Sequence, residues 1–231
     1  KHVVMLWIAA AITVVLAIYG TRRYRQSENA QPKGLSHLYE ILMNFIRNDI
    51  VIPNIGESQG RFWTPLITTY FLFILTCNFL GLIPFFELIP GGSSTVTGNF
   101  NTTAGLASIT FFAIIMAGSM KHGFLGYWKN MIPSGVPGPV LLILIPIEIL
   151  GMFVRPFALT MRLGANMTAG HIGMLAIFAL PIILTAAPVG IVSILLNTGI
   201  YFLEIIVSFV QAYVFTLLSS VFIGMAIHIE H

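Results

Sequence analysis

Charged side chains are scarce in this sequence. Only 8% of its 231 residues are Asp, Glu, Lys or Arg, against about 25% in an ordinary soluble domain. Hydrophobic residues make up 57% of the chain, and the net charge is +3. The composition therefore predicts a membrane protein. Its cationic residues cluster between the apolar runs, which is typical of orientation in a bilayer and not of a nucleic-acid surface.

Two kinds of site are missing as well. The chain has no glycine-rich phosphate-binding loop and no cysteine and histidine spacing typical of a metal site. Its single cysteine, Cys77, cannot form an internal disulfide and lies in an apolar run, so we interpret it as a packing residue. We therefore expect a non-catalytic protein without a metal or a cofactor.

Long apolar runs predict the first three membrane helices. Residues 1–21 precede a cluster of arginines, the reverse of the order in a signal peptide, so we expect a transmembrane helix with a cytoplasmic C-terminal end. Residues 62–86 carry no charge and would extend about 37 Å as a helix, more than the ~30 Å of a hydrocarbon core. The helix at 104–120 returns to a cytoplasmic boundary at Lys121, because the loop before it has no lysine or arginine.

Residues 35–52 have a different pattern. Leu35, Leu38 and Leu42 recur at a spacing of three to four residues, with charged residues among the positions that follow and separate them. This pattern predicts an amphipathic helix along the cytoplasmic membrane surface, stopped by Pro53.

The last hundred residues contain two longer apolar segments, 140–179 and 189–228. Pro181 and Pro188 mark a turn between them. A helix that is longer than the thickness of the bilayer tilts, so we expect a long tilted hairpin. The predicted fold is an all-α membrane protein, a single membrane domain over 1–231 with five transmembrane helices and one amphipathic surface helix.

Ionisable side chains interrupt the first of these segments. Glu148, Arg155 and Arg162 follow one another at intervals of seven, and Asn166 continues the same helical stripe. His171, nine residues after Arg162, would face the opposite way on a straight helix. A charged side chain at the centre of a membrane helix costs about 2.5–3.5 kcal/mol, so these residues need partners or water.

The second segment has a polar stripe of its own. Glu204, Ser208 and Gln211 share one helical face. An antiparallel hairpin could bring this stripe against the stripe of the preceding helix.

Several sequence blocks carry a family resemblance. The blocks "RPFALTMRLGANMTAGH" and "YFLEIIVSFVQAYVFTLLSSVFIGMA", preceded in order by "FIRNDI", "FLFILTCNFLGLIP" and "PIEILGMFVRPF", resemble subunit a of F-type ATP synthase. That subunit is the membrane stator that conducts ions past the rotating c-ring. The likeness covers the chain from Leu35 onward. It departs at Gly164, where many members carry phenylalanine, while His171 and Glu204 occupy positions at which members exchange a histidine and a carboxylate.

The resemblance implies a role for each of these polar residues. Arg162 corresponds to the arginine that separates two offset proton half-channels, so that ions pass only as the ring turns. His171, Glu204 and Gln211 belong with the external half-channel, and Asn166 and Gln211 would form hydrogen bonds near Arg162.

The cytoplasmic side and the partners are implied in the same way. Glu148 would serve the cytoplasmic half-channel. Arg155 and Ser208 would be supporting residues. The hairpin would tilt against the c-ring, and the other partners are b-type peripheral-stalk subunits and the lipid bilayer. The translocated ion is the proton, with sodium as the alternative. We expect the bacterial plasma membrane as the location, with the mitochondrial inner membrane as the alternative.

Simpler interpretations remain at this stage. Ionisable residues near the midplane also occur in stand-alone secondary transporters, which usually show internal repeats, and no repeat is detected here. A structural membrane subunit is a third possibility. Arg155 and Glu148 are as consistent with membrane anchoring as with function. His171 and Glu204 could form a packing pair, and polar amides can hold helices together.

Overall fold

The computed structural model describes residues 2–22, 34–83, 96–130, 138–184 and 187–228. All regular structure in these residues is helical, without a strand, which confirms the all-α prediction. In chain order the elements are α1 (His2–Arg22), α2 (Leu35–Phe45), the π-helix Ile46–Val51, α3 (Ile52–Ile55), α4 (Glu57–Leu82), the 3-10 turn Val96–Gly98, α5 (Phe100–His122), α6 (Phe124–Asn130), α7 (Gly138–Leu184) and α8 (Ala187–Ile227).

Five helices, α1, α4, α5, α7 and α8, are long and apolar enough to cross a membrane, as predicted. Their ends differ from the expected ones. Helix α4 begins at Glu57, before the charge-free run, and α5 begins at Phe100. The Asn99 side chain caps α5 by accepting a hydrogen bond from the Asn101 N–H at 2.9 Å. The expected limits lay where the charged or polar residues give way to apolar ones. A helix instead continues through polar residues until a cap or a glycine ends it. Residues 84–86 of the expected second helix lie outside the described residues.

The segment expected as one amphipathic helix is interrupted. Residues 35–52 form α2 and then the π-helix Ile46–Val51, which leads into α3. Inside this wider turn the Ile50 carbonyl accepts hydrogen bonds from Asn54 Nδ2 at 2.6 Å and from Ser220 Oγ at 3.2 Å. Side-chain donors inserted into the backbone hydrogen-bond ladder are a usual cause of such interruptions.

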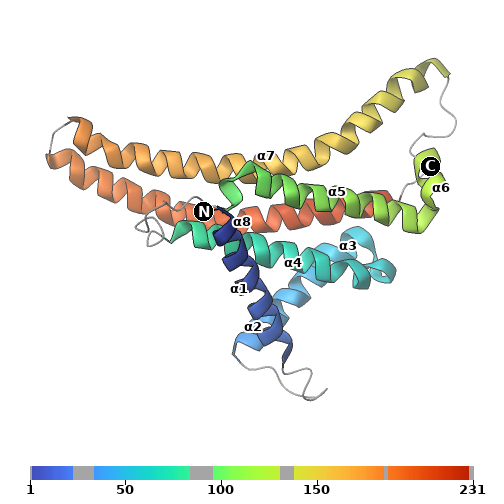
Figure 1. Ribbon diagram of the computed structural model, residues 1–231, viewed down its shortest axis with the longest axis horizontal. Helices are drawn as coiled ribbons and strands as arrows, with labels where there is room; N and C mark the ends of the chain where they lie inside the picture. Colours follow the sequence, from blue (N-terminus) through green and yellow to red (C-terminus); the bar gives the residue numbers. More distant parts are fainter. Residues whose placement is uncertain (1, 23–33, 84–95, 131–137, 185–186, 229–231) are drawn as a thin grey trace.

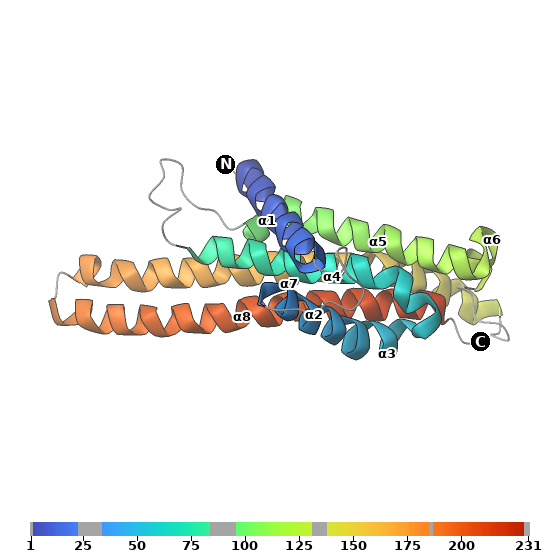
Figure 2. The same ribbon diagram turned by 90° about the horizontal axis from the view of Figure 1, so that it is seen from below.

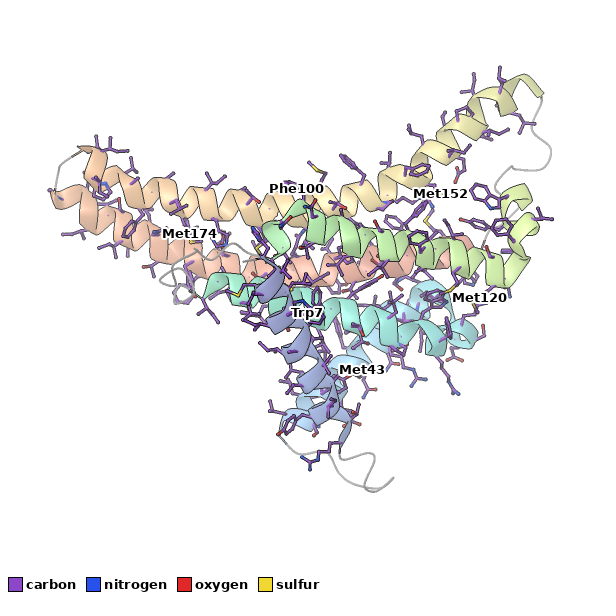
Figure 3. The ribbon with its side chains drawn as sticks, viewed as in Figure 1. Trp7, Met43, Phe100, Met120, Met152 and Met174 are labelled. Atoms are coloured by element: carbon purple, nitrogen blue, oxygen red, sulfur yellow. The ribbon has the colours of Figure 1, made fainter. Side chains whose placement is uncertain are left out.

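The long helices form one layered bundle. Figures 1 and 2 show α7 and α8 side by side and antiparallel, with α4 and α5 packed along one part of them. The rest of α7 and α8, which carries Met174 in Figure 3, extends beyond α4 and α5. Helix α1 runs obliquely across α4 (Figure 1) and contacts it.

The buried core lies where α4, α5 and α8 meet the π-helix. Its largest fully buried side chains include Trp63, Ile67 and Ile74 from α4 together with Ile46 and Ile50 from the π-helix. Because these segments are far apart in sequence, their packing fixes the position of α8 and of α7, whose Leu159 and Leu163 belong to the same cluster.

One glycine explains the departure from the family pattern at position 164. A Cβ atom on Gly164 would lie 3.1 Å from the Phe100 ring, so the ring of Phe100, labelled in Figure 3 beside α7, fills the space in front of this glycine. In this chain the aromatic ring in front of position 164 comes from α5.

Candidate functional site

Arg162 lies near the middle of α7 on its exposed side. The next residue, Leu163, is fully buried, and Leu159 is 2% exposed, so the opposite side of the helix packs into the bundle. Arg162 forms no ion pair with any described residue. Its neighbours on the exposed side, Ala158 and Ala165, are both small. The guanidinium is therefore exposed on the surface of the isolated chain, between two small side chains.

The polar stripe of α8 meets α7 beside this surface. Asn166 Nδ2 donates a hydrogen bond of 3.5 Å to Gln211 Oε1. Gln211 is 6% exposed, whereas Asn166 is exposed. The structure thus brings together the two amides that the resemblance placed near Arg162.

Glu204 is the most deeply placed acid of the two long helices. Its side chain is 5% exposed, and its carboxylate packs directly against Gly170 of α7. His171 follows this glycine. Glu204 Oε2 and His171 Nε2 are both buried without a hydrogen-bond partner among the described residues. The two groups are neighbours without a direct bond, which suits groups that exchange protons through water.

Polar groups continue from Glu204 in both directions along α8. The Ser208 hydroxyl and the Asn197 Oδ1 atom are also buried without partners in the described structure. A cavity of about 300 Å³ opens between the outer parts of α7 and α8 and is lined by Met174, Phe178, Ile194, Asn197, Thr198 and Tyr201. The unpartnered Asn197 oxygen lies at this cavity, and a buried polar atom of this kind favours bound water.

Two polar residues of this region, Asn197 and Asn78, were not predicted from the sequence. Asn197 precedes Glu204 by seven residues, so a search for the full polar stripe would have found it. Asn78 of α4 donates from Nδ2 to the Ser208 carbonyl at 3.1 Å. No spacing rule links residues 130 positions apart, and the only signal was an amide within an apolar run.

Glu148 and Arg155 lie apart from this group. Arg155 Nη2 is 3.6 Å from Glu148 Oε1, and its guanidinium lies over the Phe222 ring at 5.8 Å. The two charges therefore partner each other, with Glu148 44% exposed. Burial raises the pKa of the nearby Tyr127 hydroxyl, an effect that Arg155 partly offsets and Glu148 reinforces.

Comparison with known proteins identifies the family. The family described as ATP synthase A chain matches residues 3–224. An ATP synthase subunit a of Chloroherpeton thalassium is 43% identical over 234 residues, covering 100% of this chain and 67% of that protein. ATP synthase subunit a 2 of Chlorobaculum tepidum is 45% identical and is covered to 62%, with 98% of this chain aligned. An ATP synthase subunit a of an Anaeromyxobacter strain is 41% identical over 98% of this chain, which covers 54% of that protein. The chain therefore spans only part of each relative's length. The chain belongs to the ATP synthase subunit a family.

Proposed function

We propose that this chain is the ion-translocating stator subunit of an F-type ATP synthase, with two offset proton half-channels separated by Arg162. The observation that carries the proposal is the state of Arg162, a permanently charged group in the middle of a 47-residue apolar helix, exposed and without an ion-pair partner among the described residues. An isolated guanidinium at this depth is costly. A c-subunit carboxylate would supply the missing counter-charge.

The electrostatics of this pairing would couple ion flow to rotation. The Arg162 guanidinium favours the ionised form of a carboxylate that faces it. Each c-subunit would therefore release its proton as it approaches Arg162 and accept another after it has passed. The same positive charge repels a proton that would cross directly between the half-channels. The small side chains of Ala158 and Ala165 allow a ring helix to approach closely.

The external half-channel would run through the polar stripe of α8. It would include Glu204, His171 and Gln211, with Asn166 beside Arg162 and Ser208 as a supporting residue. Two features support this placement. The unpartnered buried oxygens and nitrogen can bind water, and the Tyr201 hydroxyl at the cavity donates to the carbonyl of Leu82, the last residue of α4, at 3.1 Å. That end of α4 is external if the positive-inside rule sets the orientation.

The cytoplasmic half-channel would begin near Glu148. Arg155, its ion-pair partner, stacks on Phe222 towards the end of α8. The pair lies near Tyr127 of α6, just beyond the basic end of α5 at Lys121. Arg155 would position the Glu148 carboxylate.

The other parts of the assignment follow from the family. The chain would assemble with the c-ring and with b-type stalk subunits in a bacterial plasma membrane, and would itself bind no cofactor. The translocated ion would be the proton, because His171 and Glu204 can pass protons through intervening water.

Replacement of Arg162 by alanine in the whole ATP synthase tests the proposal. We expect ATP-driven proton uptake into vesicles, followed with a pH-sensitive dye, to fall to background. The reason is that the c-subunit carboxylates no longer meet the guanidinium that favours their ionised form. Arg22→Ala, which removes an exposed arginine at the end of α1, is the matched control and should pump normally. Full pumping by the Arg162 variant would contradict the stator role. Proton or solute transport by the chain alone, without the ring, would instead support a stand-alone transporter.

A further inference from the structure

A second cavity lies where the π-helix and α3 meet the start of α4, elements that Figure 1 shows side by side. Its volume is about 450 Å³, and it is lined by Arg47, Ile52, Glu57, Ser58 and Arg61. This volume is within the range of about 300–1,000 Å³ typical of small-molecule sites. None of the residues assigned to ion conduction lines it.

The two arginines of this cavity are available for a ligand. Neither Arg47 nor Arg61 forms an ion pair within the described parts of the chain. Glu57 and Arg61 have the four-residue spacing at which helical ion pairs usually form. Here the two side chains instead border a common cavity, which holds two positive charges and one negative charge.

The walls of the cavity are held by the fold. Ile50 and Val51 of the π-helix are fully buried, and Ser220 of α8 donates to the Ile50 carbonyl. A Cβ atom on Gly60 would lie 3.4 Å from Val51, so the glycine allows α4 to pack closely against the π-helix. These contacts hold together the backbone segments that carry Arg47 and Arg61.

The cavity lies at the level of the lipid headgroups. Arg61 directly precedes Phe62 and Trp63, where the charge-free run of α4 begins, and aromatic residues favour the membrane interface. No apolar run between Arg22 and Glu57 is long enough to cross the bilayer. The cavity is therefore on the same side as the arginines that follow α1, which is the cytoplasmic side by the positive-inside rule.

Ser58 also lies at the centre of a short sequence motif. Residues 56–60 spell GESQG, which matches the spacing of a serine nucleophile turn. That turn requires a strand followed by a helix, whereas this stretch follows helix α3. Ser58 is better placed as a hydrogen-bond donor in the cavity than as a nucleophile.

We propose that this cavity binds the headgroup of phosphatidylethanolamine from the cytoplasmic leaflet. The lipid phosphate lies between Arg47 and Arg61, whose planar guanidinium groups suit phosphate oxygens, and accepts a hydrogen bond from Ser58. The ethanolamine ammonium donates to the Glu57 carboxylate. Phosphatidylglycerol offers the phosphate without the ammonium, and phosphatidylcholine has no N–H to donate. The site requires neither the c-ring nor Arg162.

Lipid retention by the whole ATP synthase tests this site. The complex is reconstituted into phosphatidylcholine vesicles that contain equal minor amounts of phosphatidylethanolamine and phosphatidylglycerol, extracted again in mild detergent, and analysed for retained lipid by mass spectrometry. We expect the unmodified complex to retain phosphatidylethanolamine selectively. The double variant Arg47→Gln/Arg61→Gln should lose it by about tenfold or more, as expected for removal of charged hydrogen bonds.

Two further variants separate the contributions. Glu57→Gln should keep phosphate binding but lose the preference for phosphatidylethanolamine over phosphatidylglycerol. Lys121→Gln removes a positive charge at the end of α5 from a residue that does not line the cavity, and should change nothing. Three results would overturn the proposal: retention of both lipids in their vesicle ratio, unchanged retention in the double arginine variant, or unchanged preference in Glu57→Gln. Release of a stalk subunit from the double variant with lipid retention intact would also overturn it, because the arginines would then bind protein.

Discussion

At the scale of single residues, glycines decide how closely the polar groups approach. Gly170 leaves room for the Glu204 carboxylate, because a Cβ atom at this position would overlap it. Gly173, three residues further along α7, has open space where its Cβ would be. The position of the buried acid therefore depends on the absence of one particular methyl group.

This difference predicts opposite results for two similar substitutions. Gly170→Ala should displace Glu204 and lower proton flux by about tenfold or more, as small misplacements of reacting groups commonly do. Gly173→Ala should leave the flux unchanged. The measurement is the rate of ATP-driven proton uptake in reconstituted vesicles. Equal rates for both variants would show that the Glu204 position does not limit conduction.

At the scale of elements, one part of the α5–α7 contact is filled by an aromatic ring of α5. Phe100 occupies the space in front of Gly164. Gly164→Phe, which introduces the residue that many family members carry, should therefore overpack this contact at a cost of about 1–3 kcal/mol.

A double substitution tests the exchange of rings. Phe100→Ala combined with Gly164→Phe should recover most of the thermal stability that the single Gly164→Phe variant loses, measured as the Tm of the purified complex. Phe112→Ala removes a ring that is 67% exposed and, as the control, should give no recovery. Additive losses in the double variant would mean that the two positions do not share one space.

The sequence allowed the elements to be predicted better than their details. Five spans could be recognised because long, mostly apolar runs have one common cause, burial in lipid. The π-helix could not, because the Ser220 hydroxyl that bonds to Ile50 is 170 residues away. The stripe of Glu204, Ser208 and Gln211 follows from helical spacing. The contact between Glu204 and Gly170 depends instead on the relative shift of two helices, which no local pattern specifies.

At the scale of the whole molecule, the fold places three polar regions apart from one another. The exposed side of α7 presents Arg162, the buried side of α8 holds the polar stripe, and the basic cavity at the start of α4 lies apart from both. The outer parts of α7 and α8 extend beyond α4 and α5 (Figure 2) and expose large apolar side chains such as Leu175 and Leu195. We infer that lipid and other subunits cover these apolar surfaces.

Disulfide cross-linking measures most directly whether the Arg162 side of α7 faces the ring. Cysteine replaces Ala165, three residues from Arg162 on the exposed side, in a chain whose buried Cys77 is changed to serine, and a second cysteine is placed beside the c-subunit carboxylate. We predict that oxidation joins the two subunits and stops ATP-driven rotation until a reductant is added. A cysteine at the buried Leu163 should form no such bond. Absence of the Ala165 cross-link in an intact, active complex would contradict the account.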